Sequence, residues 1–149
     1  MIAWREARAA DVPAVVALLV DDSLGALREG RDLAAYAAAF DAMQTEAANH
    51  LIVGEDRKGR VVACYQICFI SGLSLKASRR ALLEAVRVAS DLRGQGIGAA
   101  LIADAETRAR AAGCRLIQLT TNKSRLRAHA FYERLGFTAS HIGYKRELD

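Results

Sequence analysis

The sequence predicts a single α/β domain over residues 1–149, in which helices cover both faces of a mixed central β-sheet. Three observations lead to this fold class. The apolar pattern alternates between the two-residue period of strands and the 3.6-residue period of helices, in the order β α α β β β α β α β. Three strand-like segments in the middle follow one another without a helix, which favours antiparallel pairing. A later strand–helix–strand unit predicts a right-handed parallel crossover.

The first half predicts one strand, two helices and a hairpin. Residues 2–7 suit a short strand, and Asp11 suits the N-cap of the first helix. Asp32 is expected to cap a second helix, because apolar residues follow it at helical spacing. The turn-forming residues 55–59 join two β-type runs, and this arrangement is typical of an antiparallel hairpin.

The second half alternates strands and helices after a polar loop at residues 71–80. Glycines are expected to end both late helices, because glycine tolerates the left-handed conformation found just past a helix C-terminus. The expected elements are a strand at 81–89, a helix at 98–112 before Gly113, a strand at 114–121, a helix at 124–135 before Gly136, and a last strand at 137–148.

Composition limits the class of protein. No run approaches the roughly 18 apolar residues of a membrane span, and the first residues do not resemble a signal peptide, so we expect a cytoplasmic protein that binds no membrane. A net charge of +4 is too mild to indicate nucleic acid as a partner. Cys64, Cys68 and Cys114 lack the spacing of a disulfide framework or a zinc site, so we expect reduced thiols and no metal.

A glycine-rich segment lies between the strand at 81–89 and the following helix. Glycines at alternate positions let a ligand approach the backbone closely, and a helix N-terminus attracts anions, so this segment predicts a phosphate site. A P-loop is excluded, because no Gly-Lys-Ser/Thr follows. A dinucleotide site is disfavoured, because the next strand ends without the acidic residue that binds a ribose. The segment reads Arg93, Gly94, Gln95, Gly96, Ile97, Gly98.

These residues resemble motif A of the GCN5-related N-acetyltransferases (GNAT), Arg/Gln-x-x-Gly-x-Gly/Ala. The opening Arg5-x-Ala7-x-x-x-Asp11 looks like the first strand and helix of that family. Residues 130–137, Ala-Phe-Tyr-Glu-Arg-Leu-Gly-Phe, look like motif B, and both motifs stand in the family's order. The resemblance implies the GNAT fold and acetyl-CoA as the acyl donor.

The resemblance also implies which residues hold acetyl-CoA. The pantetheine arm is expected to pair with the backbone of Val86, Arg87 and Val88, and the amides from Arg93 to Gly98 are expected to bind the pyrophosphate. Asn122 suits a pantetheine contact by residue type. The family often places its asparagine seven residues before the motif B tyrosine, and Arg125 occupies that position here. The sequence leaves the choice between Asn122 and Arg125 open.

Two residues are candidates for the acid–base chemistry. Glu84 interrupts an apolar strand and resembles the strand glutamate that acts as a base in some members. Strand alternation would place it on one face with Val86 and Val88, and a backbone N–H near Val88 would stabilise the oxyanion. The alternative is a carboxylate paired with Arg79, Arg80 or Arg87. Tyr132 occupies the motif B tyrosine position and is the candidate acid; the alternative is an aromatic packed beside Phe131.

The acceptor is expected to be a small-molecule amine. Two candidate acceptor segments carry opposite charges, which are Asp21, Asp22 and Glu29 in one and Lys76, Arg79 and Arg80 in the other. A protein N-terminus or lysine remains an alternative acceptor, and a non-catalytic acyl-CoA-binding module remains an alternative function. The apolar surface of the second helix and the last strand allows a homodimer. The approach to motif B looks most like that of bacterial members.

Overall fold

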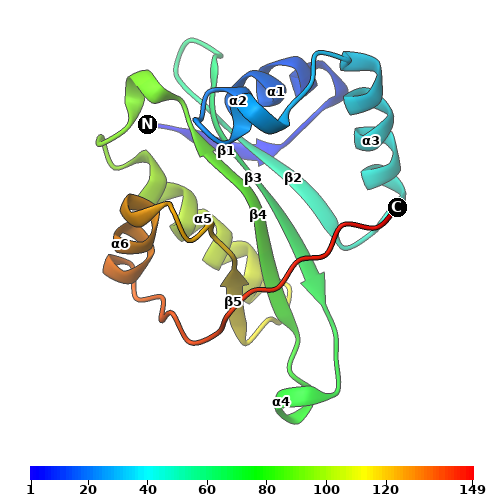
Figure 1. Ribbon diagram of the computed structural model, residues 1–149, viewed down its shortest axis with the longest axis vertical. Coiled ribbons are helices and arrows are strands. Elements are labelled where there is room, and N and C mark those ends of the chain that lie inside the picture. Colours follow the sequence, from blue (N-terminus) through cyan, green and yellow to red (C-terminus); the bar gives the residue numbers. More distant parts are fainter. The chain divides into compact units, whose positions relative to one another are not determined.

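The computed structural model describes all 149 residues and divides into two units, residues 1–118 and residues 119–149. The first unit contains a five-stranded sheet (Figure 1). The last strand of this sheet ends at the first residue of the second unit. In spatial order the strands are β1 (Ala3–Glu6), β2 (Asn49–Glu55), β3 (Val61–Ile70), β4 (Arg80–Val88) and β5 (Leu116–Leu119).

The sheet is mixed, as predicted. Strands β1 to β4 pair antiparallel in sequence order. The N–H of Arg115 donates to the carbonyl oxygen of Arg79 at 2.9 Å, which joins the residues just before β5 and β4. Because the two strands therefore start at the same end, β5 runs parallel to β4.

Helices cover both faces of this sheet. On one face, Val15 and Leu18 of α1 (Val12–Val20) pack against the side chains of Val53, Val62 and Cys64. Phe40 of α3 (Leu33–Thr45) packs beside α1 on that face. On the other face, Tyr65 donates a hydrogen bond from its hydroxyl to Asp104 of α5 (Ile97–Ala111). The remaining short helices of this unit are η1 (Ala9–Asp11), α2 (Gly25–Arg28), α4 (Ser74–Ala77) and η2 (Ser90–Leu92).

One of the two predicted helix caps is confirmed. The Asp32 carboxylate accepts from the N–H groups of Ala34 and Ala35 at the start of α3. Asp11 precedes α1 but does not cap it; its carboxylate accepts from the N–H of Arg8 and binds the guanidinium of Arg5. The carboxylate that sequence reasoning assigned to the helix therefore joins β1 to the start of α1.

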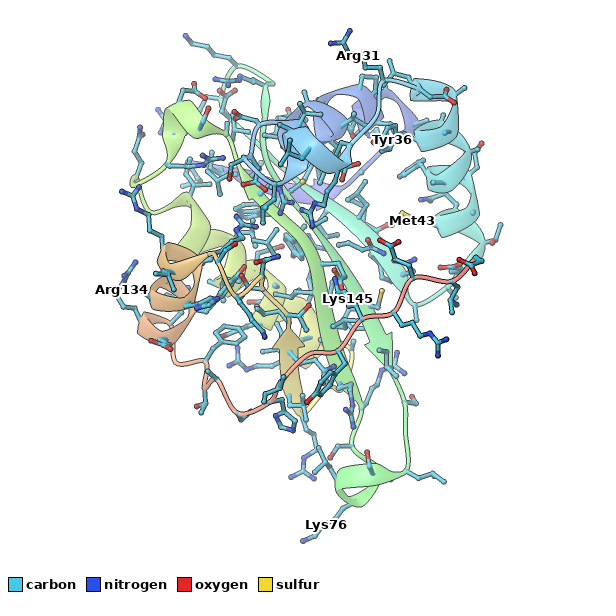
Figure 2. All side chains as sticks on the ribbon, in the orientation of Figure 1. Arg31, Tyr36, Met43, Lys76, Arg134 and Lys145 are labelled. Atoms are coloured by element: carbon cyan, nitrogen blue, oxygen red, sulfur yellow. The ribbon has the colours of Figure 1, made fainter.

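The β3–β4 connection is a projecting hairpin, whereas the sequence predicted only a polar loop. Leu75, Lys76 and Ala77 have φ angles of 52°, 58° and 59°, so the tip is one left-handed turn. Lys76 extends from this tip away from the sheet (Figure 2). None of the helices combines the length and the apolar character needed to cross a membrane.

The second unit contains one helix, α6 (Leu126–Arg134). The sequence predicted a further strand over residues 137–148, and this prediction is wrong, because these residues form no strand. The alternation that suggested it is present in Ile142, Tyr144 and Leu148, but all three side chains are exposed. A two-residue period describes side-chain alternation only, and a strand also needs a neighbour for its backbone.

Candidate active site

Strand β4 contains a β-bulge at its centre. Gln66 of β3 pairs with Glu84, whereas Cys64, two residues earlier, pairs with Arg87, three residues later. The extra residue lies on β4, where Ala85 has a φ of 52°. The bulge corrects the expected alternation, because Glu84 shares a face with Arg87 and not with Val88, which pairs with Ala63 on the opposite face.

Side chains on the α1 face bind the carbonyl groups at the bulge. The Cys64 thiol contacts the carbonyl oxygen of Ala85 at 3.6 Å, and burial raises the pKa of this thiol to about 12, so it remains protonated and able to donate. The Nη1 group of Arg87 donates to the carbonyl oxygen of Val86 at 2.9 Å, and its Nη2 lies 3.6 Å from the Asp22 carboxylate. These contacts hold the bulge and neutralise Arg87.

Glu84 is exposed and makes no hydrogen bond or ion pair with the protein. The three arginines that could have neutralised it bind elsewhere. Arg79 donates to Ser71, Arg80 donates to Ser74 and Gln118, and Arg87 binds Asp22. The carboxylate next to the bulge is therefore available to a ligand, and the alternative of a structural ion pair has no support.

The glycine-rich segment has the geometry of an anion site. Gly94 and Gly96 have φ angles of 78° and 82°, which residues with a side chain rarely adopt. A Cβ atom at either position would meet no other atom within 4 Å, so open space faces this backbone. The first hydrogen bond of α5 joins the N–H of Ala100 to the carbonyl of Gly96 at 3.1 Å, and the preceding N–H groups from Gly94 onward lie outside the helix ladder.

Arg93 has a bracing contact that the sequence did not reveal. Its Nη2 donates to the carbonyl oxygen of Asp21 at 2.6 Å, and its Nε donates to that of Val88 at 3.3 Å. The Asp21 carboxylate accepts from the N–H of Ser90 at 2.8 Å, and this hydrogen bond lowers the pKa of Asp21. The end of α1 thus holds both sides of the turn that leads into the glycine-rich segment.

The second unit holds the other two candidate residues. The Asn122 Oδ1 atom accepts from the N–H and hydroxyl groups of Ser124, at 3.0 and 2.8 Å, which leaves its Nδ2 group without a protein acceptor. Tyr132 lies near the end of α6, where its ring packs edge-on against those of Phe131 and Phe137, with centroids 5.1 and 5.6 Å away. The packing fixes the direction of the tyrosine ring within this unit.

In the first unit, the predicted residues form one continuous path along the chain. Glu84 stands at the bulge, Val86, Arg87 and Val88 complete β4, and the glycine-rich segment follows. Sequence reasoning missed the bulge, because no glycine in β4 marks its position. It also missed the bracing role of Asp21, although this carboxylate had been singled out for its charge.

Comparison with known proteins identifies the family. The family model described as the acetyltransferase (GNAT) family matches residues 14–137. A crystal structure from Bacillus halodurans, described as a transcriptional regulator, is 41% identical, covers 99% of this chain and 100% of its own, and has a TM-score of 0.94. Glucosamine-6-phosphate N-acetyltransferase from Arabidopsis thaliana shares the fold, at 18% identity and a TM-score of 0.81 over 100% and 99% of the two chains.

A curated relative matches a shorter stretch. The aminoalkylphosphonate N-acetyltransferase of Salmonella typhimurium is 47% identical over 57 residues, which are 38% of this chain and 37% of that protein. The family match, by contrast, spans most of the chain and includes β4, the glycine-rich segment and α6. The chain therefore belongs to the acetyltransferase (GNAT) family, for which acetyl-CoA is the acyl donor.

Proposed function

We propose that this protein transfers the acetyl group of acetyl-CoA to the primary amine of a small molecule, and that residues 1–149 act as one transferase domain. The observation that carries the proposal is the row of backbone N–H groups from Gly94 onward, which lie outside the hydrogen bonds of α5 and next to the open space beside Gly94 and Gly96. Such groups, together with the positive end of the helix dipole, bind phosphate oxygens. The family match supplies the identity of the phosphate ligand.

The donor would lie along β4 and the segment that follows it. The pyrophosphate binds the N–H groups from Gly94 to Gly98; the sequence predicted Arg93 as well, but its N–H donates to the carbonyl oxygen of Ser90 at 3.5 Å. The pantetheine arm pairs with the backbone of Val86, Arg87 and Val88. The Nδ2 group of Asn122 is available to donate to a pantetheine carbonyl. The bracing of Arg93 by Asp21 and Val88 supports this assignment, because it holds the pyrophosphate segment and the end of β4 together.

Glu84 would begin the reaction as the general base. An alkylammonium ion must lose a proton before its nitrogen can attack, and a carboxylate without a protein partner can accept that proton directly or through a water molecule. The nitrogen then forms a bond to the thioester carbon, and the carbonyl π electrons move onto oxygen. A backbone N–H of β4 near Val88 stabilises the resulting oxyanion.

Tyr132 would complete the reaction as the general acid. When the tetrahedral intermediate collapses, the C–S bond breaks and its electron pair leaves with sulfur. The tyrosine hydroxyl, whose ordinary pKa of about 10 exceeds the 8.5 of a thiol, gives its proton to that sulfur. The attacking nitrogen gives its second proton to water as the amide forms. The products are the N-acetyl compound and CoA, and solvent returns a proton to the phenolate and takes the one held by Glu84.

A cationic acceptor fits the distribution of charge in the first unit. The three acidic residues of the candidate acceptor segment each have a partner within the protein: Asp21 is bound by Ser90, Asp22 by Arg87 and Glu29 by Tyr36. Glu84 remains available beside the bulge. The curated relative makes aminoalkylphosphonates the first acceptors to test, ahead of peptide N-termini and lysines.

The test is a thiol-release assay with acetyl-CoA and a panel of aminoalkylphosphonates, polyamines, amino acids, aminoglycosides and a lysine peptide. With the best amine, we expect Glu84→Gln and Tyr132→Phe to lower kcat by roughly 10²–10⁴-fold while the KM for acetyl-CoA stays nearly constant. Asp41→Asn, which removes an exposed carboxylate of α3 that has no protein partner, is the matched control and should retain full activity.

Three results would contradict the proposal or part of it. Binding of CoA without thiol release for any amine would identify an acyl-CoA-binding module in place of an enzyme. An unchanged kcat in Tyr132→Phe or Glu84→Gln would remove that residue from the mechanism. Rapid acetylation of the peptide with no small amine accepted would move the function to protein acetylation.

A further inference from the structure

A chain of three polar side chains crosses the sheet toward Glu84. It begins at Glu46, just after α3, passes through Asn49 at the start of β2, and ends at Gln66 on β3. The Nδ2 group of Asn49 lies 2.6 Å from a carboxylate oxygen of Glu46, and the Nε2 group of Gln66 lies 2.7 Å from the Oδ1 atom of Asn49. The mechanism described above assigns no role to this chain.

The carboxylate fixes the direction of every hydrogen bond in the chain. An ionised carboxylate only accepts, so Asn49 must turn its amide nitrogen toward Glu46. Its Oδ1 atom then faces Gln66, which must donate from Nε2. The Cys68 thiol donates to the same Oδ1 atom at 3.3 Å, which supports this orientation of the amide. The polarity of the chain therefore leaves the Oε1 atom of Gln66 as an acceptor at its end.

This acceptor is a neighbour of Glu84. Gln66 and Glu84 are register partners on β3 and β4, and directly opposed side chains on one face have Cβ atoms about 4.5–5.5 Å apart. The bulge begins at the next residue, Ala85. Neither the Oε1 atom of Gln66 nor the Glu84 carboxylate accepts a hydrogen bond from the protein.

No donor of the protein binds the two facing acceptors, which are the Oε1 atom of Gln66 and the Glu84 carboxylate. Burial raises the pKa of Cys68, and the negative charges of Glu46 and Glu84 raise it further. Both carboxylates are therefore close enough to affect the same thiol.

Two arginines of β4 share the face of Glu84. Arg87 is bound by Asp22 and the carbonyl of Val86, and Arg80 donates to Ser74 and Gln118. A ligand group that fits here must bring several N–H donors, and a primary amine or its ammonium form does so.

We propose that Gln66 is a specificity-determining residue that contacts the acceptor. Its Oε1 atom accepts a hydrogen bond from the amine beside Glu84, and Glu46 and Asn49 hold the amide group of Gln66 in the orientation that presents Oε1. The inference rests on the proposed acetyltransfer and names a residue that selects its acceptor. It implies a preference for primary amines over their N-methyl analogues. The ammonium form of a primary amine presents an N–H to both Gln66 and Glu84 in every rotamer of its C–N bond, whereas the N-methyl analogue does so only when its methyl group points away from both.

The experiment measures steady-state kinetics with the best primary amine of the panel and with its N-methyl analogue. Gln66→Leu, which removes the acceptor at similar volume, should raise the KM for the amine roughly 10–100-fold and leave the KM for acetyl-CoA unchanged. It should also reduce the ratio of kcat/KM between the primary amine and its N-methyl analogue. Gln44→Leu, on α3, is the matched control and should change neither quantity.

A second variant tests the direction of these hydrogen bonds without changing Gln66. Glu46→Gln allows the amide groups of Asn49 and Gln66 to flip, so that Gln66 presents Nε2 in place of Oε1. We expect a smaller rise in the KM for the amine and the same loss of selectivity. An unchanged KM and selectivity in Gln66→Leu would overturn the inference while the proposed function stands. If Gln66→Leu melts early, unchanged selectivity in Glu46→Gln overturns it instead. A wild-type protein that acetylates no amine would overturn both.

Discussion

Ala85 occupies a backbone conformation that suits glycine better. Its φ of 52° costs an L-residue roughly 1–2 kcal/mol, and the cost is sustained by the contacts that hold the bulge. We expect Ala85→Gly to keep the fold and to change the free energy of unfolding by less than about 1 kcal/mol, toward higher stability. Ala85→Val should lower it by roughly 1–3 kcal/mol, because a β-branched residue fits this region poorly.

Urea unfolding monitored by circular dichroism measures both changes. Ala81→Gly in the same strand is the control, because Ala81 is fully buried and is not among the positive-φ residues. It should destabilise the protein by about 1 kcal/mol. A loss of stability in Ala85→Gly equal to that of the control would show that the bulge imposes no strain on residue 85.

At the scale of single residues, the sequence identified candidates but not their partners. Glu84 stood out because a carboxylate interrupts an apolar strand, and that reasoning needs only local sequence. Its lack of a partner depends on where Arg79, Arg80 and Arg87 bind, and those contacts reach Ser71, Gln118 and Asp22. The orientation of Gln66 likewise depends on Glu46, which is 20 residues away and carries no motif.

At the scale of elements, two glycines beside α5 make a matched pair. Gly96 precedes the helix with a φ of 82°, Gly113 follows it with a φ of 77°, and a Cβ atom at either would meet nothing within 4 Å. Gly96→Ala and Gly113→Ala should therefore lower the melting temperature by similar amounts. Only Gly96→Ala should raise the KM for acetyl-CoA, by roughly 10-fold or more, because its methyl group enters the space in front of the N–H row.

Thermal melting and acetyl-CoA kinetics on the two variants separate the backbone effect from the ligand effect. An equal rise in the KM for acetyl-CoA in both would attribute it to general destabilisation of α5. An unchanged KM in Gly96→Ala would remove the glycine-rich segment from donor binding.

Elements that follow from local chemistry were predicted well. Asp32 caps α3, and Gly113 and Gly136 follow the ends of α5 and α6 with positive φ angles. The failures are features that local sequence does not encode. The bulge in β4 requires knowledge of the register with β3, and the left-handed turn at the hairpin tip uses Leu75, Lys76 and Ala77, none of which favours that conformation.

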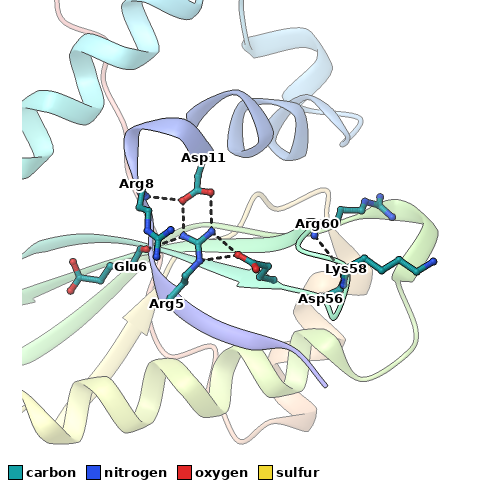
Figure 3. Close-up of polar contacts among 8 residues, drawn as sticks. Arg5, Glu6, Arg8, Asp11, Asp56, Lys58 and Arg60 are labelled. Carbon is teal, nitrogen blue, oxygen red and sulfur yellow. Dashed lines mark hydrogen bonds and ion pairs between the residues drawn. The ribbon is translucent and has the colours of Figure 1, made fainter.

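At the scale of the first unit, one arginine joins three elements (Figure 3). Arg5 of β1 donates two hydrogen bonds to the Asp11 carboxylate, at 2.7 and 3.0 Å, and two more to Glu55 of β2, at 2.9 and 2.7 Å. Asp11 also accepts from the N–H of Arg8. The spacing Arg5-x-Ala7-x-x-x-Asp11, noted in the sequence, thus has a physical reason: it lets β1 hold both the start of α1 and the neighbouring strand.

This connection makes stability depend on pH in the acid range. The hydrogen bonds from Arg5, opposed in part by burial, lower the pKa of Asp11 below its usual range. A depressed pKa in the folded state adds stability that is fully present above the unfolded value of about 3.9 and is lost as the pH falls through the folded value. We expect Asp11→Asn to reduce the free energy of unfolding by about 1–3 kcal/mol at pH 7, and the difference from wild type to shrink below pH 4. Urea unfolding at pH 7, 4 and 2.5 measures the difference in the free energy of unfolding between Asp11→Asn and wild type.

Asp56→Asn is the control. The pKa of the Asp56 carboxylate is also lowered, but this carboxylate holds only its own turn. A difference for Asp11→Asn that stays constant down to pH 2.5 would mean that the charge of Asp11 does not stabilise the fold.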